Sequence, residues 1–376
     1  MKIAVNCWVL RNKKIDGIGN FTIETLKVLI AKHPEIEFQI LCDKNFTENY
    51  FDFPNAKKYH IFPPYRHPLL YLFYMEIIVG IFLKKHKPSI FLSMEGFLCL
   101  SSKCKQLPII YDLNFEHQPK DLPFRNRIYF RTFYPKFARK ATRIATISDY
   151  SKNDIVNTYG IDKNRIDNVS CGVKQNFFPI QDVVKNEIKI KYSAGNEYFF
   201  FIGSIHPRKN IVRLLQAFQL FKATSSSNFK LILAGNIFWG DENVQAVLST
   251  MNNKDDVIFT GRVSDEELVK LLGSSFALTF VPTFEGFGLP IVEAFQSEVP
   301  VICSNTTSMP EVAGNAALLV NPFSVENIAD QMKMLYNNKL LRKELVERGN
   351  IQKNLFTWDR TAMMLYESIQ KCYEPL

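Results

Sequence analysis

The segment Thr283-Phe-Glu-Gly-Phe-Gly-Leu-Pro-Ile-Val-Glu293 joins an apolar run that ends at Val281 to a helix-length stretch of this 376-residue chain. Pro290 fits the first turn of a helix, where no N–H group is needed. The segment is therefore predicted to be the loop between a β-strand and an α-helix. Gly286 and Gly288 let the backbone approach a ligand closely, and the free amides at a helix start suit a phosphate.

Two carboxylates frame this segment. Glu285 lies in the loop and Glu293 about one turn into the helix. Both can therefore border one cleft and accept hydrogen bonds from sugar hydroxyls. The structural alternative is a glycine turn followed by a first-turn acid that stabilises the helix dipole.

A second loop of the same kind is Phe201-Ile-Gly-Ser-Ile-His-Pro-Arg-Lys-Asn-Ile211, again between an apolar run and a helix-length stretch. Arg208 and Lys209 place two adjacent cations at a helix start, which the helix dipole disfavours. An anionic ligand would resolve this conflict, whereas the alternative is a solvated basic turn. A third turn, Asp16-Gly-Ile-Gly-Asn-Phe-Thr22, matches a phosphate-binding fingerprint incompletely, because threonine replaces the third glycine. It is either such a site or a plain turn.

Strand-like apolar runs alternate with amphipathic stretches along the chain, which predicts an α/β protein with parallel sheets covered by helices. The expected strands form two series, at 2–9, 37–42, 89–92, 107–111 and 143–147, and at 198–202, 230–234, 257–259, 277–281 and 299–302. We therefore expect two Rossmann-like domains, at residues 1–178 and 179–357, with a C-terminal helix at 358–376 that packs on either one. Ligands are expected at the carboxyl ends of the strands, in a cleft between the domains.

The composition is that of a folded globular protein, with 47% apolar and 22% charged residues. The seven cysteines contain no Cys-x-x-Cys pair, which indicates reduced cytosolic thiols and no structural zinc. The longest apolar run, at 69–83, includes Glu76 and is shorter than the ~20 residues that a membrane span needs. These features predict a cytoplasmic protein.

Positive charge is concentrated in the first half of the chain. Residues 1–180 contain 27 lysines and arginines against 16 acidic residues, a net charge of +11 within a total of +9. Such a charge favours an anionic partner: a phosphorylated substrate, a membrane surface or nucleic acid. Residues 124–143 alternate arginines and lysines with aromatic residues, which indicates either an amphipathic helix on an anionic membrane or a core helix with a basic face. No nucleic-acid recognition motif is present, so nucleic acid is not the expected partner.

Several of these motifs resemble the donor domain of glycosyltransferase family 4, retaining enzymes of GT-B architecture. The resemblance is carried by 203–210, by Glu285 and Glu293 with the Gly-Phe-Gly-Leu-Pro run between them, and by Ser308-Met-Pro-Glu-Val-Ala-Gly314 with the run at 318–322. It covers residues 198–360, and the first domain is similar more loosely, through its Gly17-Ile-Gly19 turn. The chain looks most similar to mannosyltransferase-like members that build O-antigen, capsule or exopolysaccharide.

The resemblance implies roles for individual residues. Arg208 and Lys209 would neutralise the donor diphosphate, and Glu285 would hold the transferred sugar; these three are the expected catalytic residues. Glu293 would hold the ribose hydroxyls. The complete set expected to bind the donor is Gly17, Gly19, Gly203, Arg208, Lys209, Glu285, Phe287, Gly288, Leu289 and Glu293. No cofactor is expected, since the nucleotide diphosphate sugar is a substrate, and no metal either, because no Asp-x-Asp motif is present.

One position departs from the family pattern. Many relatives have a His-Asp pair where this chain has Tyr111-Asp112, so these two residues are only candidates for the acceptor side. The expected function is retaining transfer of a hexose, with mannose favoured, to a saccharide or lipid-linked saccharide at the inner face of the membrane. The alternatives are a GT-B protein that binds a nucleotide sugar without turnover, and a nucleic-acid-binding protein.

Overall fold

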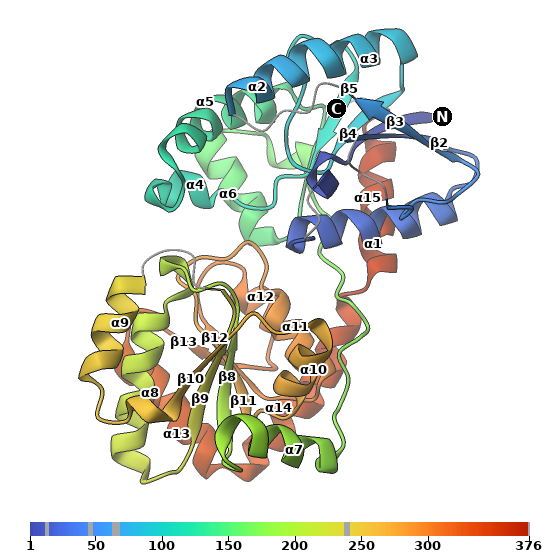
Figure 1. The fold of residues 1–376 in the computed structure, drawn as a ribbon. Helices are drawn as coiled ribbons and strands as arrows, with labels where there is room; N and C mark the ends of the chain where they lie inside the picture. The colour runs from blue at the N-terminus through green and yellow to red at the C-terminus, as the bar shows by residue number, and fades with distance from the viewer. Residues whose placement is uncertain (12–14, 44–47, 62–67, 237–240, 375–376) are drawn as a thin grey trace. The chain divides into compact units, whose positions relative to one another are not determined.

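A computed structural model describes residues 1–11, 15–43, 48–61, 68–236 and 241–374. The chain divides into two compact units (Figure 1). Unit 1 consists of Met1–Gly172 together with Thr357–Leu376, and unit 2 consists of Val173–Phe356. The sequence analysis predicts domain boundaries after residues 178 and 357, whereas in the structure the boundaries follow Gly172 and Phe356. Residues 173–180 belong to unit 2 because Val173 N–H donates to the Phe356 carbonyl at 3.3 Å and Ile180 packs against Gly273.

Unit 1 contains a parallel five-stranded sheet in the order β3-β2-β1-β4-β5. Its strands are β1 Lys2–Asn6, β2 Glu37–Asp43, β3 Ala56–Ile61, β4 Ile90–Ser93 and β5 Lys105–Pro108, and a separate pair is formed by β6 Ile144–Thr146 and β7 Ile166–Asn168. Its helices are α1 Gly17–Lys32, α2 Pro68–Phe73, the π-helix η2 Tyr74–Val79, α3 Gly80–His86, α4 Asn114–His117, α5 Phe124–Lys140, α6 Asp149–Tyr159 and α15 Trp358–Lys371, with short 3-10 turns η1 Trp8–Arg11, η3 Pro119–Asp121 and η4 Lys163–Arg165.

The C-terminal helix α15 belongs to unit 1, where it lies against α1 (Figure 1). Trp358 packs edge-on against Phe21, with ring centroids 6.0 Å apart, and Lys32 forms an ion pair with Asp359 at 2.5 Å. A side chain at Gly172 would meet Trp358 at 2.5 Å, so glycine is required where the chain leaves the unit.

Unit 2 contains a parallel six-stranded sheet in the order β10-β9-β8-β11-β12-β13, with helices on both sides (Figure 1). Its strands are β8 Tyr198–Ile202, β9 Lys230–Ala234, β10 Val257–Gly261, β11 Ala277–Phe280, β12 Val301–Ser304 and β13 Leu318–Val320. Its helices are α7 Asp182–Ser193, α8 Ile211–Ser225, α9 Asp241–Thr250, α10 Asp265–Gly273, α11 Leu289–Gln296, α12 Met309–Ala313, α13 Val325–Asn337 and α14 Lys339–Gln352, with 3-10 turns η5 Pro207–Lys209, η6 Lys254–Asp256 and η7 Lys353–Leu355.

The two parallel sheets confirm the predicted α/β class. The central strand β8 has no exposed side chain from Tyr198 to Phe201, as expected for a parallel strand covered on both faces. The prediction missed the edge strands β3 and β13. Of the six residues of β3 only Ile61 is buried, so this strand lacks the apolar run that indicates a strand. Strand β13 is apolar, but it has only three residues.

Candidate functional site

The loops that follow β8 and β9 meet through two glycines. Gly203 has φ +146°, and a Cβ atom on Gly235, which has φ +150°, would lie 1.9 Å from the Gly203 carbonyl oxygen. Neither position can accept another residue without moving the backbone. Gly203, one of the residues expected to bind the donor, therefore sets the path of the chain at the carboxyl end of the central strand.

The sequence predicts that Arg208 and Lys209 stand at the start of a helix, but the structure does not place them in the first turn of α8. They lie in the separate 3-10 turn η5, and α8 begins at Ile211 after a left-handed residue, Asn210, with φ 64°. The buried Asn210 side chain donates to the Val281 carbonyl at 3.0 Å and to the Pro322 carbonyl at 2.7 Å. Sequence analysis gave Asn210 no role, although an asparagine between a basic turn and a helix is a signal for left-handed backbone.

The structure brings Arg208, Lys209 and Glu285 together in one ionic cluster. Arg208 Nη1 lies 2.5 Å from Glu285 Oε1, and Lys209 Nζ donates to the same oxygen. Lys209 is buried, with Nζ 4.9 Å from the centroid of the Phe280 ring. Burial opposes ionisation of Glu285, but the two cations outweigh it and hold its pKa below the ordinary value. Two cations share one carboxylate, which leaves one positive charge for an anionic ligand.

The loop that carries Glu285 is anchored at both ends. Thr283 N–H donates to the Arg208 carbonyl at 2.8 Å, which ties the loop to η5. The buried Ser308 hydroxyl lies 2.9 Å from the carbonyl oxygens of both Glu285 and Phe287. Ser308 is a positioning residue to which the sequence analysis assigned no role, even though it begins one of the motifs that carry the family resemblance.

Gly288 ends this loop and precedes α11. Its φ is +107°, and a Cβ atom there would lie 2.6 Å from Met309 Cε. The predicted loop-to-helix transition and the place of Pro290 in the first turn are confirmed. The Leu289 amide stands at the start of α11 and has no acceptor within that helix, which suits it to an anion. The backbone-amide roles of Phe287, Gly288 and Leu289 stay predictions.

Glu293 lies one turn into α11 in a different environment from Glu285. Its half-buried carboxylate has neither a hydrogen-bond nor an ion-pair partner within the part of the chain that the structure describes. Burial raises its pKa to about 7, while Lys174 lowers it and Asp265 raises it further. A carboxyl group that is desolvated without a partner suits a ligand that supplies hydrogen-bond donors.

The remaining candidates lie in unit 1. Gly17 and Gly19 stand in the first turn of α1 and not in a preceding loop, and the Asp16 carboxylate accepts from Gly19 N–H at 2.8 Å. This amide is therefore engaged, and diphosphate contacts by the two glycines stay a prediction. Tyr111 donates to the Met94 carbonyl at 3.0 Å, and burial raises its pKa far above the ordinary value.

Asp112, the other acceptor-side candidate, accepts from the Asn114 amide at 2.9 Å at the start of α4. Tyr111 packs edge-on against Phe21, with ring centroids 5.3 Å apart. These contacts give both residues a structural role in unit 1. A role for either in acceptor binding stays a prediction.

Comparison with known proteins places these motifs in a family. Residues 184–352 match the profile of "Glycosyl transferases group 1". The chain is similar to the O-antigen chain mannosyltransferase B of Escherichia coli, with 31% identity over 245 residues, 65% of this chain and 63% of that protein. It is also similar to the O-antigen chain mannosyltransferase RfbU of Salmonella typhimurium, with 30% identity over 199 residues, 53% of this chain and 52% of the relative. The match thus spans less than two thirds of either relative.

Solved structures show the same fold over the full chain. Sucrose-phosphate synthase from Thermosynechococcus elongatus aligns with a TM-score of 0.78 at 15% identity, covering 99% of both chains. Anabaena HepE, solved with UDP and glucose, aligns with a TM-score of 0.76 at 14% identity, covering 99% of this chain and 100% of HepE. The predicted resemblance is confirmed: residues 184–352 match the group 1 glycosyl transferases, and the chain has the GT-B fold of these structural neighbours.

Proposed function

We propose that this protein transfers a hexose, with mannose favoured, from a nucleotide diphosphate sugar to a saccharide or lipid-linked saccharide acceptor in cell-surface polysaccharide synthesis. The observation that carries the proposal is the cluster of Arg208, Lys209 and Glu285 at the carboxyl ends of β8 and β11. The mannosyltransferase relatives support the choice of sugar, and their O-antigen names support the class of product.

The chemistry requires stabilisation of a leaving nucleoside diphosphate. As the glycosidic bond breaks, negative charge develops on the β-phosphate, and fixed cations stabilise it without reorganising. Lys209 is held in place by burial and by Glu285 before any ligand arrives. A bound diphosphate would compete with Glu285 for both cations and leave this carboxylate free to accept hydrogen bonds from hydroxyls of the transferred sugar.

Glu293 would accept hydrogen bonds from the ribose hydroxyls of the donor. Its half-buried carboxylate has a raised pKa because it is desolvated and has no partner among the described residues, and a vicinal diol offers two donors to such a group. These hydrogen bonds favour the ionised form. Binding of the donor should therefore strengthen as the pH rises through 7.

Tyr111 is unsuited to act as a general base at neutral pH. Its hydroxyl donates to a backbone carbonyl, and burial keeps the phenol protonated. We therefore assign the acceptor's proton to an oxygen of the departing diphosphate. Attack on the face that the leaving group vacates would retain the anomeric configuration, and no divalent metal is required in this scheme.

Calorimetric titration of wild type and Lys209→Ala with GDP-mannose, GDP-fucose, UDP-glucose, UDP-galactose and UDP-N-acetylglucosamine tests the donor site. We expect one nucleotide sugar to bind wild type. The variant should bind it roughly 100-fold more weakly or not at all, because it lacks a buried charged hydrogen bond. Release of nucleoside diphosphate on addition of a saccharide acceptor, unaffected by EDTA, would distinguish transfer from binding without turnover. Binding of none of these donors by folded protein would contradict the proposal.

A further inference from the structure

The helix at 68–86 in unit 1 presents apolar side chains to solvent along one side. Leu70, Phe73, Ile77 and Ile81 are 45%, 49%, 45% and 61% exposed. Their spacing of three to four residues puts them on one helical face, which in a globular protein normally packs on a core. Here the opposite face fills the core with Tyr74, Met75, Val79, Phe82 and Leu83.

Lysines follow this apolar face directly. Lys84 and Lys85 are exposed in the last turn of α3, and Lys87 ends the helix in a left-handed conformation with φ 47°. A groove of about 760 Å³ runs beside them, and its lining includes Ile77, Ile81, Lys84, Lys87 and Lys103.

Among the described residues that line this groove, the only carboxylate is already engaged. Glu76 accepts from the amides of Leu100 and Ser101 at 2.6 and 2.9 Å. Within the described residues, Lys84, Lys87 and Lys103 have no acidic partner. The groove therefore combines apolar walls with uncompensated positive charge.

Helix α5 continues the same surface. It packs against α2, with Tyr71 and Tyr129 edge to face at 5.4 Å. Beside this contact α5 exposes Phe124 and Ile128, at 65% and 51%. Two helices that pack on each other through this aromatic pair thus both expose apolar side chains.

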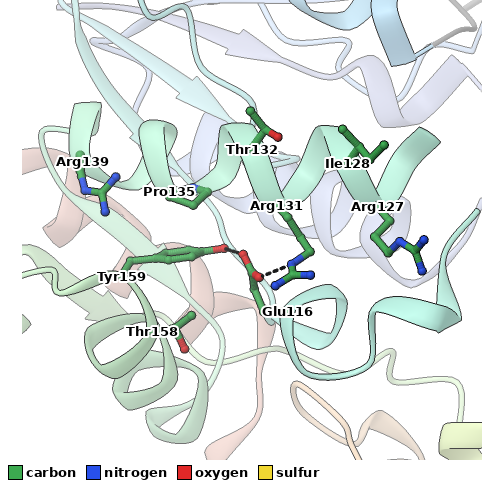
Figure 2. A pocket seen from close by; sticks show the side chains of 9 residues that line it. All are labelled: Glu116, Arg127, Ile128, Arg131, Thr132, Pro135, Arg139, Thr158 and Tyr159. Carbon is green, nitrogen blue, oxygen red and sulfur yellow. Dashed lines mark hydrogen bonds and ion pairs between the residues drawn. The ribbon is translucent and has the colours of Figure 1, made fainter. Parts of the chain in front are cut away.

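A pocket of about 500 Å³ lies along α5, and its lining includes Arg127, Ile128, Arg131 and Arg139 (Figure 2). Arg131 donates to Glu116 at 3.0 Å, and Tyr159 donates to the same carboxylate at 3.0 Å. Arg127 and Arg139 have no acidic partner within the described part of the chain. The lining of the pocket carries a net positive charge, which suits a phosphate group.

We propose that these elements form one surface by which the protein docks on an anionic phospholipid bilayer. Its apolar members would enter the interface between headgroups and acyl chains, and its cations would bind lipid phosphates. This basic-apolar surface consists of Leu70, Phe73, Ile77, Ile81, Phe124 and Ile128 with Lys84, Lys85, Lys87, Lys103, Arg127 and Arg139.

Charge and geometry together favour a bilayer as the occupant. An interfacial helix combines an apolar stripe with flanking lysines and arginines, and this arrangement is present on both helices. Among the helices of the described residues, none is long and apolar enough to cross a membrane, so docking would be in the plane of the interface. The surface lies wholly within unit 1. The inference adds a location to the proposed function, since a lipid-linked acceptor would be met there, but its test requires no glycosyl transfer.

Flotation of the full chain with vesicles of phosphatidylcholine, with and without phosphatidylglycerol, tests the proposal. We expect binding to the anionic vesicles only, weakened by high salt because exposed charges are screened. Lys84→Gln/Lys85→Gln/Lys87→Gln should lower the partition coefficient roughly 100-fold, since each lysine near the surface contributes a factor of about five. Ile77→Ser/Ile81→Ser should lower it roughly tenfold or more.

Two matched controls separate this surface from general effects of the substitutions. Ile190→Ser removes an isoleucine of α7 that is even more exposed, at 70%, and Arg360→Gln removes an exposed arginine from α15; neither should change flotation. All substituted side chains are exposed, so unchanged thermal unfolding verifies the fold. Absence of flotation with anionic vesicles would overturn the proposal, as would flotation that the lysine and isoleucine variants leave unchanged. A dimer that Ile77→Ser/Ile81→Ser dissociates, without any vesicle binding, would assign the surface to self-association and overturn it too.

Discussion

Replacing Glu293 by glutamine should stabilise the protein at alkaline pH while it weakens donor binding. In the folded chain the pKa of Glu293 is about 7, against 4.5 for an ordinary glutamate, because the half-buried carboxylate is desolvated and has no partner among the described residues. The folded state therefore holds its proton more tightly than the unfolded state. The resulting loss of stability is absent below pH 4.5, grows as the pH rises from 4.5 to 7, and is complete above pH 7.

The difference between the two pKa values sets the size of the effect. At about 1.4 kcal/mol per pKa unit, ionisation of Glu293 lowers the free energy of unfolding by about 3 kcal/mol at pH 8 and by less than about 1 kcal/mol at pH 5. Glutamine resembles the protonated acid in shape and charge. Glu293→Gln should therefore stabilise the protein by close to these amounts at the two pH values.

Chemical denaturation at pH 5 and pH 8, followed by circular dichroism, measures this difference, and calorimetry measures donor affinity in parallel. Loss of a charged hydrogen-bond acceptor should weaken nucleotide-sugar binding roughly 10- to 100-fold. The exposed Glu347 pairs with Lys343 at 3.8 Å on the helix surface, so Glu347→Gln is a control that should change stability by less than about 0.5 kcal/mol. The reasoning fails if Glu293→Gln destabilises the protein at pH 8, or if its effect is the same at both pH values.

Three further substitutions test the positioning of the loops. Ser308→Ala removes the hydroxyl bound to the Glu285 carbonyl and should weaken donor binding several-fold, with a loss of about 1 kcal/mol in stability; unchanged affinity would deny Ser308 a positioning role. Gly288→Ala places a Cβ atom against Met309 at positive φ and should destabilise the protein by at least about 2 kcal/mol, measured by thermal unfolding; a neutral result would contradict the required glycine conformation. Tyr111→Phe keeps the buried ring and loses one hydrogen bond, so turnover should change less than threefold while stability falls by about 1 kcal/mol; a hundredfold loss of turnover would show that Tyr111 acts in catalysis.

The sequence predicted those features that depend on local patterns. The Tyr198–Ile202 run predicts a buried strand because every residue is apolar, and Pro290 marks the start of α11 because proline fits the first helical turn. The two loops with Arg208 and Glu285 could be paired in advance, since strands of one parallel sheet present their carboxyl ends at one edge.

Features that depend on tertiary contacts could not be predicted in this way. The left-handed turn at Asn210 is stabilised by carbonyls far away in the sequence. The capping of Gly19 by Asp16 requires the backbone geometry of the helix start. Likewise, the apolar run at 69–83 with the lysines after it suggested a membrane-facing helix, but not that Ile77 and Ile81 are the residues facing solvent, because an apolar stripe is the same in sequence whether or not a core covers it.

The central claim is that the cluster of Arg208, Lys209 and Glu285 binds the diphosphate of a sugar donor. Calorimetric titration of wild type and Lys209→Ala with the nucleotide-sugar panel tests it most directly. The account predicts that one donor binds wild type and that the variant, still folded, binds it about 100-fold more weakly. Equal affinity of the two proteins for that donor would contradict it.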